Sequence, residues 1–279
     1  IRADIPLSGA ISNTDPAYAR SEGIGVARTD GRMMLEDAMP LEETESARNS
    51  AELVNEFVHE SHLVLDRHEI NKKRIAQGRL SANVILTRDA GDRLPRFPRI
   101  SDLYGVRFAC LADMPVERGI GRLADMTVVD LPPPSNDLVG DCKLRLRKLL
   151  SLMDLYDCFY VHIKGPDEPG HDGDAQLKTT MISQIDRSFF GDLVSELDLG
   201  RVVVCVTSDH STSCITRGHS DDPVPILVSG NNIQGDGLPR FSETECAKGS
   251  LGILPQGVQL MPILMKNISP SPIRKRGFE

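Results

Sequence analysis

The sequence of 279 residues contains no tryptophan, and aromatic residues make up only 4% of it. Proteins that bind single-stranded nucleic acid need aromatic side chains on which bases stack, so this scarcity argues against that class. Basic residues are also in the minority, with 32 lysines and arginines against 40 aspartates and glutamates, which gives a net charge of -8. An acidic protein is poorly suited to a phosphate backbone. We therefore expect no nucleic-acid partner.

Long apolar runs are absent as well. No window approaches the roughly 18 to 20 consecutive apolar residues of a membrane span, and residues 1–4 have neither a basic nor an apolar signal region. The six cysteines include no CxxC pair, and at least Cys158 and Cys205 lie in apolar runs typical of buried strands. We predict no membrane association and a reducing, cytoplasmic compartment.

The composition is that of a protein with a core, since 40% of the residues are hydrophobic and 26% are charged. The length allows one large domain or two smaller ones, and we expect two. Apolar residues at helical spacing predict a long amphipathic helix from Thr44 to His68, followed by a strand at 82–87. A loop with Pro95 and Pro98 then indicates a crossover between domains. The predicted domains are residues 1–99 and 100–279.

Strands and helices alternate beyond residue 100, which is typical of an α/β fold with a mainly parallel sheet. The predicted strands are 106–111, 127–131, 158–163, 202–207 and 224–229, and the predicted helices are 116–126, 138–155 and 177–197. The run at 202–207 is so continuously apolar that both of its faces should be covered. Ligands of open parallel sheets bind beyond the carboxyl ends of the strands. The loops at those ends are therefore the places to look for a site.

Histidines and carboxylates gather in these loops. Asp167 and His171 follow one predicted strand, Asp209 and His210 follow another, and His219 precedes a third. Imidazole together with carboxylate suits borderline ions such as Mn²⁺ or Zn²⁺ better than Ca²⁺ or Mg²⁺. Three unrelated loops that face solvent are the alternative. The recurrence of the pattern favours a metal site.

For three other histidines, His59, His62 and His162, we expect structural roles without metal binding. His59 and His62 are three residues apart on the predicted long helix, a spacing that could chelate a metal ion, but no third ligand is apparent. A solvated helix face is the simpler interpretation. His162 lies inside a predicted strand, where we expect a core histidine with satisfied hydrogen bonds.

The order of the motifs carries a resemblance to a known family. The segments 165–173 (GPDEPGHDG), 207–212 (TSDHST) and 219–225 (HSDDPVP) resemble the metal-binding motifs of the alkaline phosphatase superfamily. They are most similar to those of the archaeal-type, cofactor-independent (2,3-bisphosphoglycerate-independent) phosphoglycerate mutases. Segments 14–16, 50–55, 86–91 and 246–249 also fit. The resemblance implies an α/β fold: a partial alkaline-phosphatase-like core at 100–279, with a mainly parallel sheet flanked by helices, and the remainder of an inserted α+β substrate-binding domain at 1–99.

The resemblance also implies an activity and its metals. Such an isomerase interconverts 3-phosphoglycerate and 2-phosphoglycerate through a phosphoserine intermediate, in glycolysis and gluconeogenesis. It uses two divalent metal ions, for which we expect Mn²⁺, with Zn²⁺, Mg²⁺ or Co²⁺ as alternatives. By resemblance, Asp167, His171 and His219 hold one ion. Asp209 and His210 contribute to the second site.

One part of the family's machinery has no match in this sequence. The second metal site of the family also uses an aspartate and the nucleophilic serine, both near the native N-terminus. None of the serines here, including Ser208 and Ser211, lies in the nucleophile motif. Because the sequence also lacks an initiator methionine, we expect it to begin inside the inserted domain. By itself the chain should bind metal but be inactive as a mutase.

The phosphoglycerate substrate should be bound by cationic side chains. Arg88 and Arg93 are predicted to bind it, because a planar guanidinium makes bidentate contacts with phosphate and carboxylate, and Lys164 is the next candidate. Ordinary ion pairs with Asp89 and Asp92 are the alternative for the arginines. The oligomeric state stays open. Two other functions are a phosphomonoester hydrolase or phosphosugar mutase of the same superfamily, and a non-catalytic metal-binding fragment.

Overall fold

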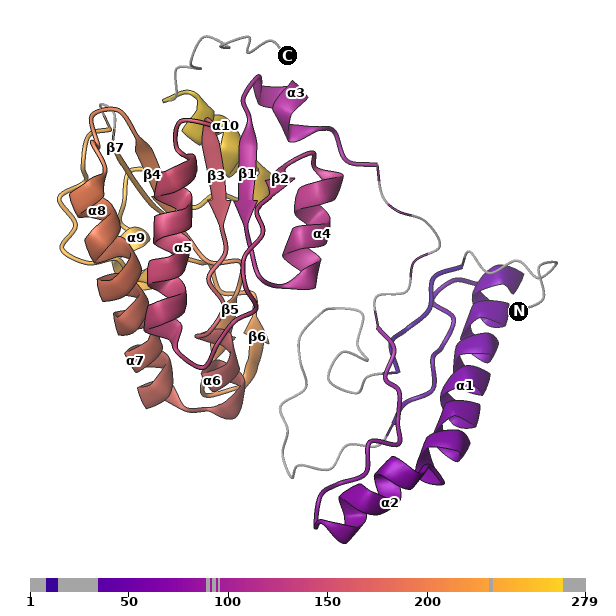
Figure 1. Cartoon of the computed structure of the whole chain (residues 1–279). Coiled ribbons are helices and arrows are strands. Elements are labelled where there is room, and N and C mark those ends of the chain that lie inside the picture. Colours follow the sequence, from indigo (N-terminus) through magenta and orange to yellow (C-terminus); the bar gives the residue numbers. More distant parts are fainter. Residues whose placement is uncertain are drawn as a thin grey trace, which may run out of the picture. The chain divides into compact units, whose positions relative to one another are not determined.

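The computed structural model describes residues 9–14, 35–88, 91, 94, 96–230 and 233–267 (Figure 1). The chain forms two compact units, Ile1–Pro95 with Thr216–His219, and Arg96–Ile215 with Ser220–Glu279. The short segment Thr216–His219 therefore groups with the first unit, although its strand pairs with a strand of the second. Pro95 of the predicted crossover lies outside the described residues. That the first unit is the remainder of an inserted substrate-binding domain stays a prediction.

The first unit contains two consecutive helices, α1 (Glu45–Asp66) and α2 (Glu69–Ala76). The hydroxyl oxygen of Thr44 accepts a hydrogen bond from the Ala47 N–H (3.1 Å) and so caps the start of α1. The ring of His68 accepts one from the Ile70 N–H and caps α2. The helix predicted from Thr44 to His68 is confirmed as α1, and the chain turns at Arg67 before α2 begins.

The strand predicted at 82–87 is wrong, because these residues form neither strand nor helix. The segment is fixed by side chains instead. The Thr87 N–H donates to Thr14 Oγ1 (2.9 Å), and the Ala82 N–H donates to Asn71 Oδ1 (2.7 Å). An apolar run becomes a strand only if a neighbouring strand pairs with it, and no described residues form a ladder with this one.

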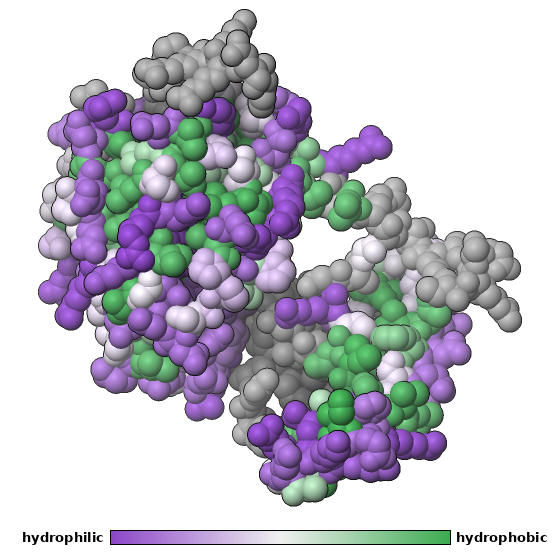
Figure 2. All heavy atoms as spheres, in the orientation of Figure 1, coloured by the Kyte–Doolittle hydropathy of each residue, from purple (hydrophilic) through white to green (hydrophobic). Residues whose placement is uncertain are grey.

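Apolar side chains remain at the surface of the first unit. Phe57, Val64 and Leu86 are each about half exposed or more. In the view of Figure 2, hydrophobic residues gather on the visible face of this unit. Its buried apolar residues are few and small, and include Ala47, Ala51 and Val58. In the described part of the chain, the first unit thus has a thinner core than the second.

The second unit is built on a parallel sheet, as predicted. Strands β1 (Phe108–Leu111), β2 (Thr127–Val128) and β3 (Cys158–Val161) are ordered β2-β1-β3. The central strand β1 is buried along its whole length. Its register places Ala109 beside Thr127 on one side and Phe159 on the other.

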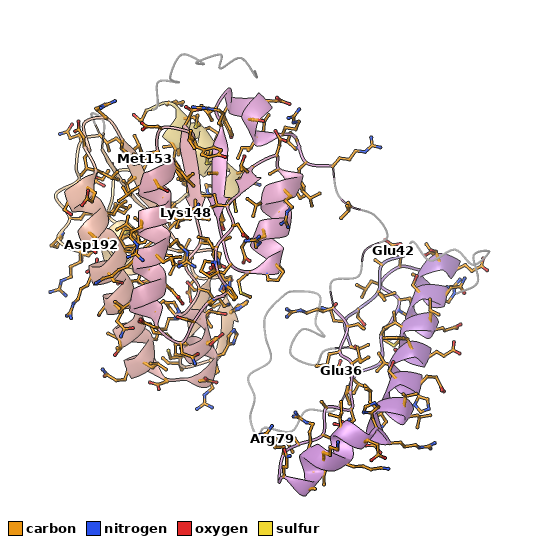
Figure 3. All side chains as sticks on the ribbon, in the orientation of Figure 1. Glu36, Glu42, Arg79, Lys148, Met153 and Asp192 are labelled. Atoms are coloured by element: carbon orange, nitrogen blue, oxygen red, sulfur yellow. The ribbon has the colours of Figure 1, made fainter. Side chains whose placement is uncertain are left out.

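Helices cover both faces of β1. Leu111 packs in a core with α5 (Leu138–Leu152) and the helices that follow residue 174, while the opposite face carries Cys110, against which Gly121 of α4 (Pro115–Leu123) packs. Figure 3 shows the side chains of the second unit on its ribbon, with Lys148 and Met153 labelled in the region of α5. The core consists of Ala109, Leu111, Val129, Cys142, Leu146, Leu149, Phe189 and Leu193. Burial on both faces explains why β1 reads as a continuous apolar run.

The helix predicted at 177–197 is present but interrupted. It comprises α7 (Ala175–Ile185), a π-helical turn (Asp186–Gly191) and α8 (Asp192–Glu196). The turn places Phe189 in the core, where its ring meets that of Phe190 edge to face.

The remaining strands do not extend the parallel sheet. Strand β4 (Val203–Val206) pairs antiparallel with β7 (Leu227–Gly230), and β5 (Ser211–Ser213) pairs with β6 (Gly218–Ser220). All four residues of β4 are half-buried, so the predicted cover on both of its faces is present but partial. The other elements are α3 (Ile100–Tyr104), α6 (Asp167–Asp172), α9 (Glu243–Cys246), a 3₁₀ turn (Gly257–Gln259) and α10 (Leu260–Met265). No helix in the described part of the chain is long and apolar enough to span a membrane.

Candidate metal centre

Helix α6 positions the first two candidate ligands. It begins at Asp167, shortly after β3, and ends at Asp172. Gly173 follows, and its positive φ of 77° closes the helix in the left-handed conformation that glycine favours. Asp167 and His171 are four residues apart and so lie on the same face of the helix. Asp167 Oδ1 and His171 Nε2 are 3.4 Å apart.

The hairpin of β5 and β6 supplies the third ligand. Helix α6 packs so closely against β5 that a Cβ atom at Gly170 would lie 2.9 Å from both the Cγ2 and the carbonyl oxygen of Thr212. Only glycine allows this approach without a shift of the backbone. Since β6 pairs with β5, His219 on β6 is carried towards the residues of α6.

The three side chains converge. One ligand atom each from Asp167, His171 and His219 can be chosen so that all lie within 4.8 Å of one another. Bonds to zinc-type ions are about 2.0 to 2.2 Å long, so shifts of about 1 Å or less would bring the three atoms around one ion. One carboxylate and two imidazoles suit Mn²⁺ or Zn²⁺. The convergence of these residues agrees with the expectation from the sequence, and their binding of an ion stays a prediction.

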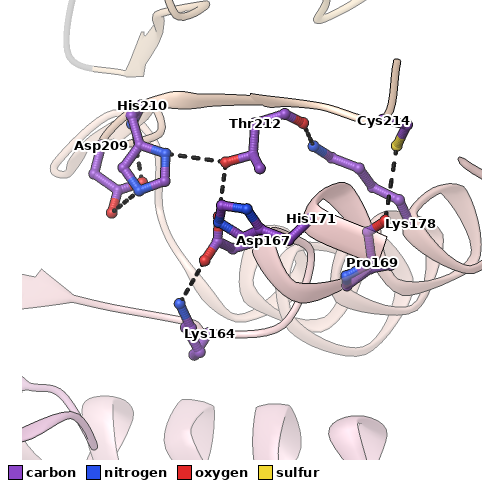
Figure 4. Close-up of polar contacts among 9 residues, drawn as sticks. All are labelled: Lys164, Asp167, Pro169, His171, Lys178, Asp209, His210, Thr212 and Cys214. Carbon is purple, nitrogen blue, oxygen red and sulfur yellow. Dashed lines mark hydrogen bonds and ion pairs between the residues drawn. The ribbon is translucent and has the colours of Figure 1, made fainter. Parts of the chain in front are cut away.

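Asp167 is held as a carboxylate by its neighbours. Lys164 Nζ donates to its Oδ2 (2.8 Å), and Thr212 Oγ1 donates to its Oδ1 (2.7 Å), as Figure 4 shows. Burial by itself raises the pKa of Asp167, but these hydrogen bonds and the charge of Lys164 outweigh burial and hold the pKa well below its ordinary value. Since metal ligation requires the deprotonated form, Asp167 is ready to bind an ion at neutral pH.

Lys164 is correspondingly kept as an ammonium group. Burial is the largest single influence and lowers its pKa, but the hydrogen bond to Asp167 and the negative charges of Asp167, Glu168 and Asp209 together outweigh burial and raise the pKa above its ordinary value. The predicted substrate-binding lysine therefore lies beside the candidate metal ligands. Of the other two predicted substrate contacts, Arg88 is exposed in the first unit and Arg93 lies outside the described residues. Binding of substrate by these three residues stays a prediction.

The second candidate pair is more open. Asp209 and His210 follow β4, and His210 Nε2 lies 3.4 Å from Asp209 Oδ2. The side chain of Asp209 is 63% exposed. Within the described ranges, no third histidine, cysteine or carboxylate joins this pair to complete a group of three. Metal binding by this pair also stays a prediction.

Comparison with known proteins places this geometry in a family. The model of the metalloenzyme superfamily matches residues 20–267. The chain belongs to this superfamily. It is 38% identical over 261 residues to the 2,3-bisphosphoglycerate-independent phosphoglycerate mutase of Aeropyrum pernix, covering 92% of this chain and 61% of that protein. It is 36% identical over 263 residues to the mutase of the same name from Methanopyrus kandleri, covering 94% of this chain and 60% of that one.

A solved structure supports the fold. The PH0037 protein from Pyrococcus horikoshii superimposes with a TM-score of 0.66 at 31% identity, covering 81% of this chain and 60% of that one. The chain spans about 60% of the length of these curated metalloenzyme relatives. The α/β class and the partial alkaline-phosphatase-like core expected from the motifs are confirmed.

The structure corrects two of the histidine assignments. His162 was expected to be a core histidine with satisfied hydrogen bonds, but its buried Nδ1 has no hydrogen-bond partner among the described residues. Its Nε2 lies 3.8 Å from Glu117 Oε1. His62 is not simply solvated, since its Nδ1 lies 2.9 Å from the carbonyl oxygen of Asn83.

Sequence reasoning missed Thr212, which contacts two of the predicted ligands of the metalloenzyme site. Its Oγ1 lies 2.7 Å from Asp167 Oδ1 and 3.1 Å from His210 Nδ1. The only signal in the sequence was its place two residues after His210. A threonine in a strand is ordinarily a packing residue, so its role became visible only through the contact with α6.

Proposed function

We propose that this chain is the metal-binding part of a phosphoglycerate mutase that interconverts 3-phosphoglycerate and 2-phosphoglycerate through a phosphoserine. The observation that carries the proposal is the convergence of Asp167, His171 and His219. It occurs in a chain more than nine-tenths of which aligns with mutases independent of 2,3-bisphosphoglycerate. A superfamily match alone would leave the reaction open, since one fold supports several activities.

We propose two divalent ions, both Mn²⁺, of which the residues present would bind one and provide part of the site for the other. Asp167, His171 and His219 would hold one, and Asp209 and His210 would provide part of the second site. When bound, such ions stabilise the charge on phosphoryl oxygens and lower the pKa of a serine nucleophile. The contribution of the protein is to hold the ligands ready: Asp167 is ionised, half-buried and hydrogen-bonded at both of its oxygens.

Lys164 is proposed to bind the substrate. Its ammonium group contacts Asp167 Oδ2 at 2.8 Å, so it lies where an anionic phosphoryl group would approach the metal ligands. Arg88 and Arg93 are proposed to bind the carboxylate or phosphate of the same substrate.

We place the reaction in the cytoplasm, where phosphoglycerate is metabolised. None of the six cysteines, all of which lie in the described part of the chain, forms a disulfide. This supports a reducing compartment.

The test uses a protein that contains these residues together with a serine-bearing segment of the family. Conversion of 3-phosphoglycerate would be followed by coupling to enolase, with Mn²⁺ present. We expect turnover that His171→Ala abolishes and that Lys148→Ala, which removes an exposed cation on α5, leaves unchanged. Release of inorganic phosphate without formation of 2-phosphoglycerate would instead assign a phosphatase.

The 279-residue chain alone provides a second measurement. Because none of its serines matches the nucleophile motif, we expect it to bind Mn²⁺ and to show no mutase activity. Turnover by the purified chain would show that the nucleophile lies within it. Absence of both Mn²⁺ binding and turnover, in the chain and in the longer protein, would overturn the proposal.

A further inference from the structure

Thr212 lies between the two candidate ligand groups. It is the middle residue of β5, and only 6% of its surface is exposed. Its single hydroxyl group contacts Asp167 of the first group and His210 of the second, at 2.7 and 3.1 Å (Figure 4). One oxygen atom therefore connects the two groups.

The two hydrogen bonds of the Thr212 hydroxyl group require one particular arrangement of hydrogens. A hydroxyl has one hydrogen to donate and lone pairs with which to accept. The ionised carboxylate of Asp167 can only accept, so the Thr212 hydrogen points to Asp167 and the His210 contact must be donated by an Nδ1–H. In the neutral ring this leaves Nε2 without a hydrogen, so that Nε2 and Asp209 Oδ2, which lie 3.4 Å apart, could both be ligands of one ion. The bridge thus selects one of the two tautomers of His210.

The backbone of Thr212 is itself fixed from two sides. Lys178 Nζ, on α7, donates to the carbonyl oxygen of Thr212 at 2.5 Å. Gly170, on α6, packs directly against the Thr212 side chain and carbonyl. Contacts with α6 and α7 therefore fix the position of the Thr212 hydroxyl group, which contacts both ligand groups.

We propose that Thr212 is a positioning residue that orients Asp167, sets the tautomer of His210 and thereby couples the two metal sites. The inference rests on the metal sites of the proposed function. Partners of this kind typically account for about 10-fold to 100-fold in metal affinity. Removing this hydroxyl should therefore weaken both sites together.

Two substitutions separate the hydroxyl from the volume of the side chain. Thr212→Val keeps the shape and removes the hydroxyl, whereas Thr212→Ser keeps the hydroxyl and removes the methyl group. Mn²⁺ binding to the 279-residue chain would be measured by titration calorimetry. We expect Thr212→Val to weaken both binding steps by about 10-fold to 100-fold, and Thr212→Ser to stay within about threefold of the unchanged chain.

The tautomer of His210 can be measured without enzymatic activity and without bound metal. Nitrogen-15 NMR of the metal-free chain should show His210 with its hydrogen on Nδ1, and Thr212→Val should shift the ring towards a mixture. Because this measurement needs no turnover, failure of the proposed mutase reaction would leave it intact.

Three results would overturn the inference. The first is an Nε2–H tautomer of His210 in the unchanged chain, which needs no variant to fold. The second is a folded Thr212→Val chain with unchanged Mn²⁺ affinity at both steps. The third is a folded Thr212→Ser chain that binds as poorly as Thr212→Val, since the methyl group and not the hydroxyl would then matter.

Discussion

The two candidate ligand groups contain the same residue types but are held in different ways. Asp167 begins a helix, has a side chain only 22% exposed and accepts hydrogen bonds at both of its oxygens. Asp209 lies in a loop after β4, and its side chain is 63% exposed. The first group also has a third ligand within reach, His219. The difference shows that preorganisation, rather than ligand chemistry, sets the two groups apart.

A site that is already assembled does not lose free energy to ordering when the ion binds. The first group should therefore bind the first equivalent of metal. The second pair should bind later and more weakly in this chain, since two ligands leave most of the coordination sphere to water. The comparison thus predicts an order of filling, which single substitutions can test.

The largest effect is expected from Asp167→Asn. Loss of a charged ligand should weaken the tighter Mn²⁺ step by more than about 100-fold, the upper end of what loss of an outer-sphere partner costs. Asp209→Asn is the matched substitution in the second group and should leave the tighter step within about threefold. Titration calorimetry on the 279-residue chain would measure both. If Asp209→Asn removed the tighter step and Asp167→Asn did not, the order of filling would be reversed.

The fold was predictable where local patterns decide it. Helix α1 followed from its apolar periodicity, and β1 from its place in the alternation of strands and helices. The segment at 82–87 contains an apolar run, Val84 to Leu86, but it lies in the unit with the thinner core and forms no strand. The antiparallel pairing of β4 with β7 was also missed. Pairing depends on which strand edges meet, and a single sequence does not record that.

The site was predictable to a similar extent. Asp167 and His171 are four residues apart on one helix, so their proximity is a local property. His219 was expected from its place before a strand, and the hairpin brings it to them. Thr212 was missed because its role arises from the close approach of α6 and β5, which Gly170 permits. A contact between two elements that forms because one residue is a glycine cannot be recognised from a single sequence.

The close approach of α6 and β5 gives the second prediction. In Gly170→Ala the new Cβ would lie 2.9 Å from the Thr212 carbonyl oxygen, so α6 must shift, at a cost of about 1 to 3 kcal/mol in the free energy of unfolding. The shift should also weaken the tighter Mn²⁺ step. Gly119→Ala, in α4 with no atom within 4 Å of the new Cβ, is the control and should stabilise the chain by about 0.5 to 1 kcal/mol. Urea unfolding would measure both. Equal effects of the two substitutions would show that the packing of α6 is not tight.

The smallest effect is expected at the other end of β3, where a carboxylate has a purely structural partner. Asp157 precedes the strand and accepts hydrogen bonds from the N–H, Nε and Nη2 of Arg107 at 2.9 to 3.0 Å. The hydrogen bond from the Arg107 guanidinium holds the pKa of Asp157 below its ordinary value. Its contribution to stability is therefore fully present above the ordinary pKa and is lost as the pH falls through the lowered one.

Asp157→Asn should cost about 1 kcal/mol at pH 7, a modest figure because the Arg107 side chain is 57% exposed and screened by water. The difference from the unchanged chain should shrink as the pH is lowered below about 4, where the aspartate of the unfolded chain becomes protonated. Urea unfolding between pH 7 and pH 3 would follow it, and Mn²⁺ affinity at pH 7 should not change. A stability difference independent of pH would mean that the charge of Asp157 contributes nothing. A loss of Mn²⁺ affinity would mean that the two ends of β3 are coupled. Asp157 would then affect metal binding as well as stability, and it would not differ from Asp167 in the way proposed.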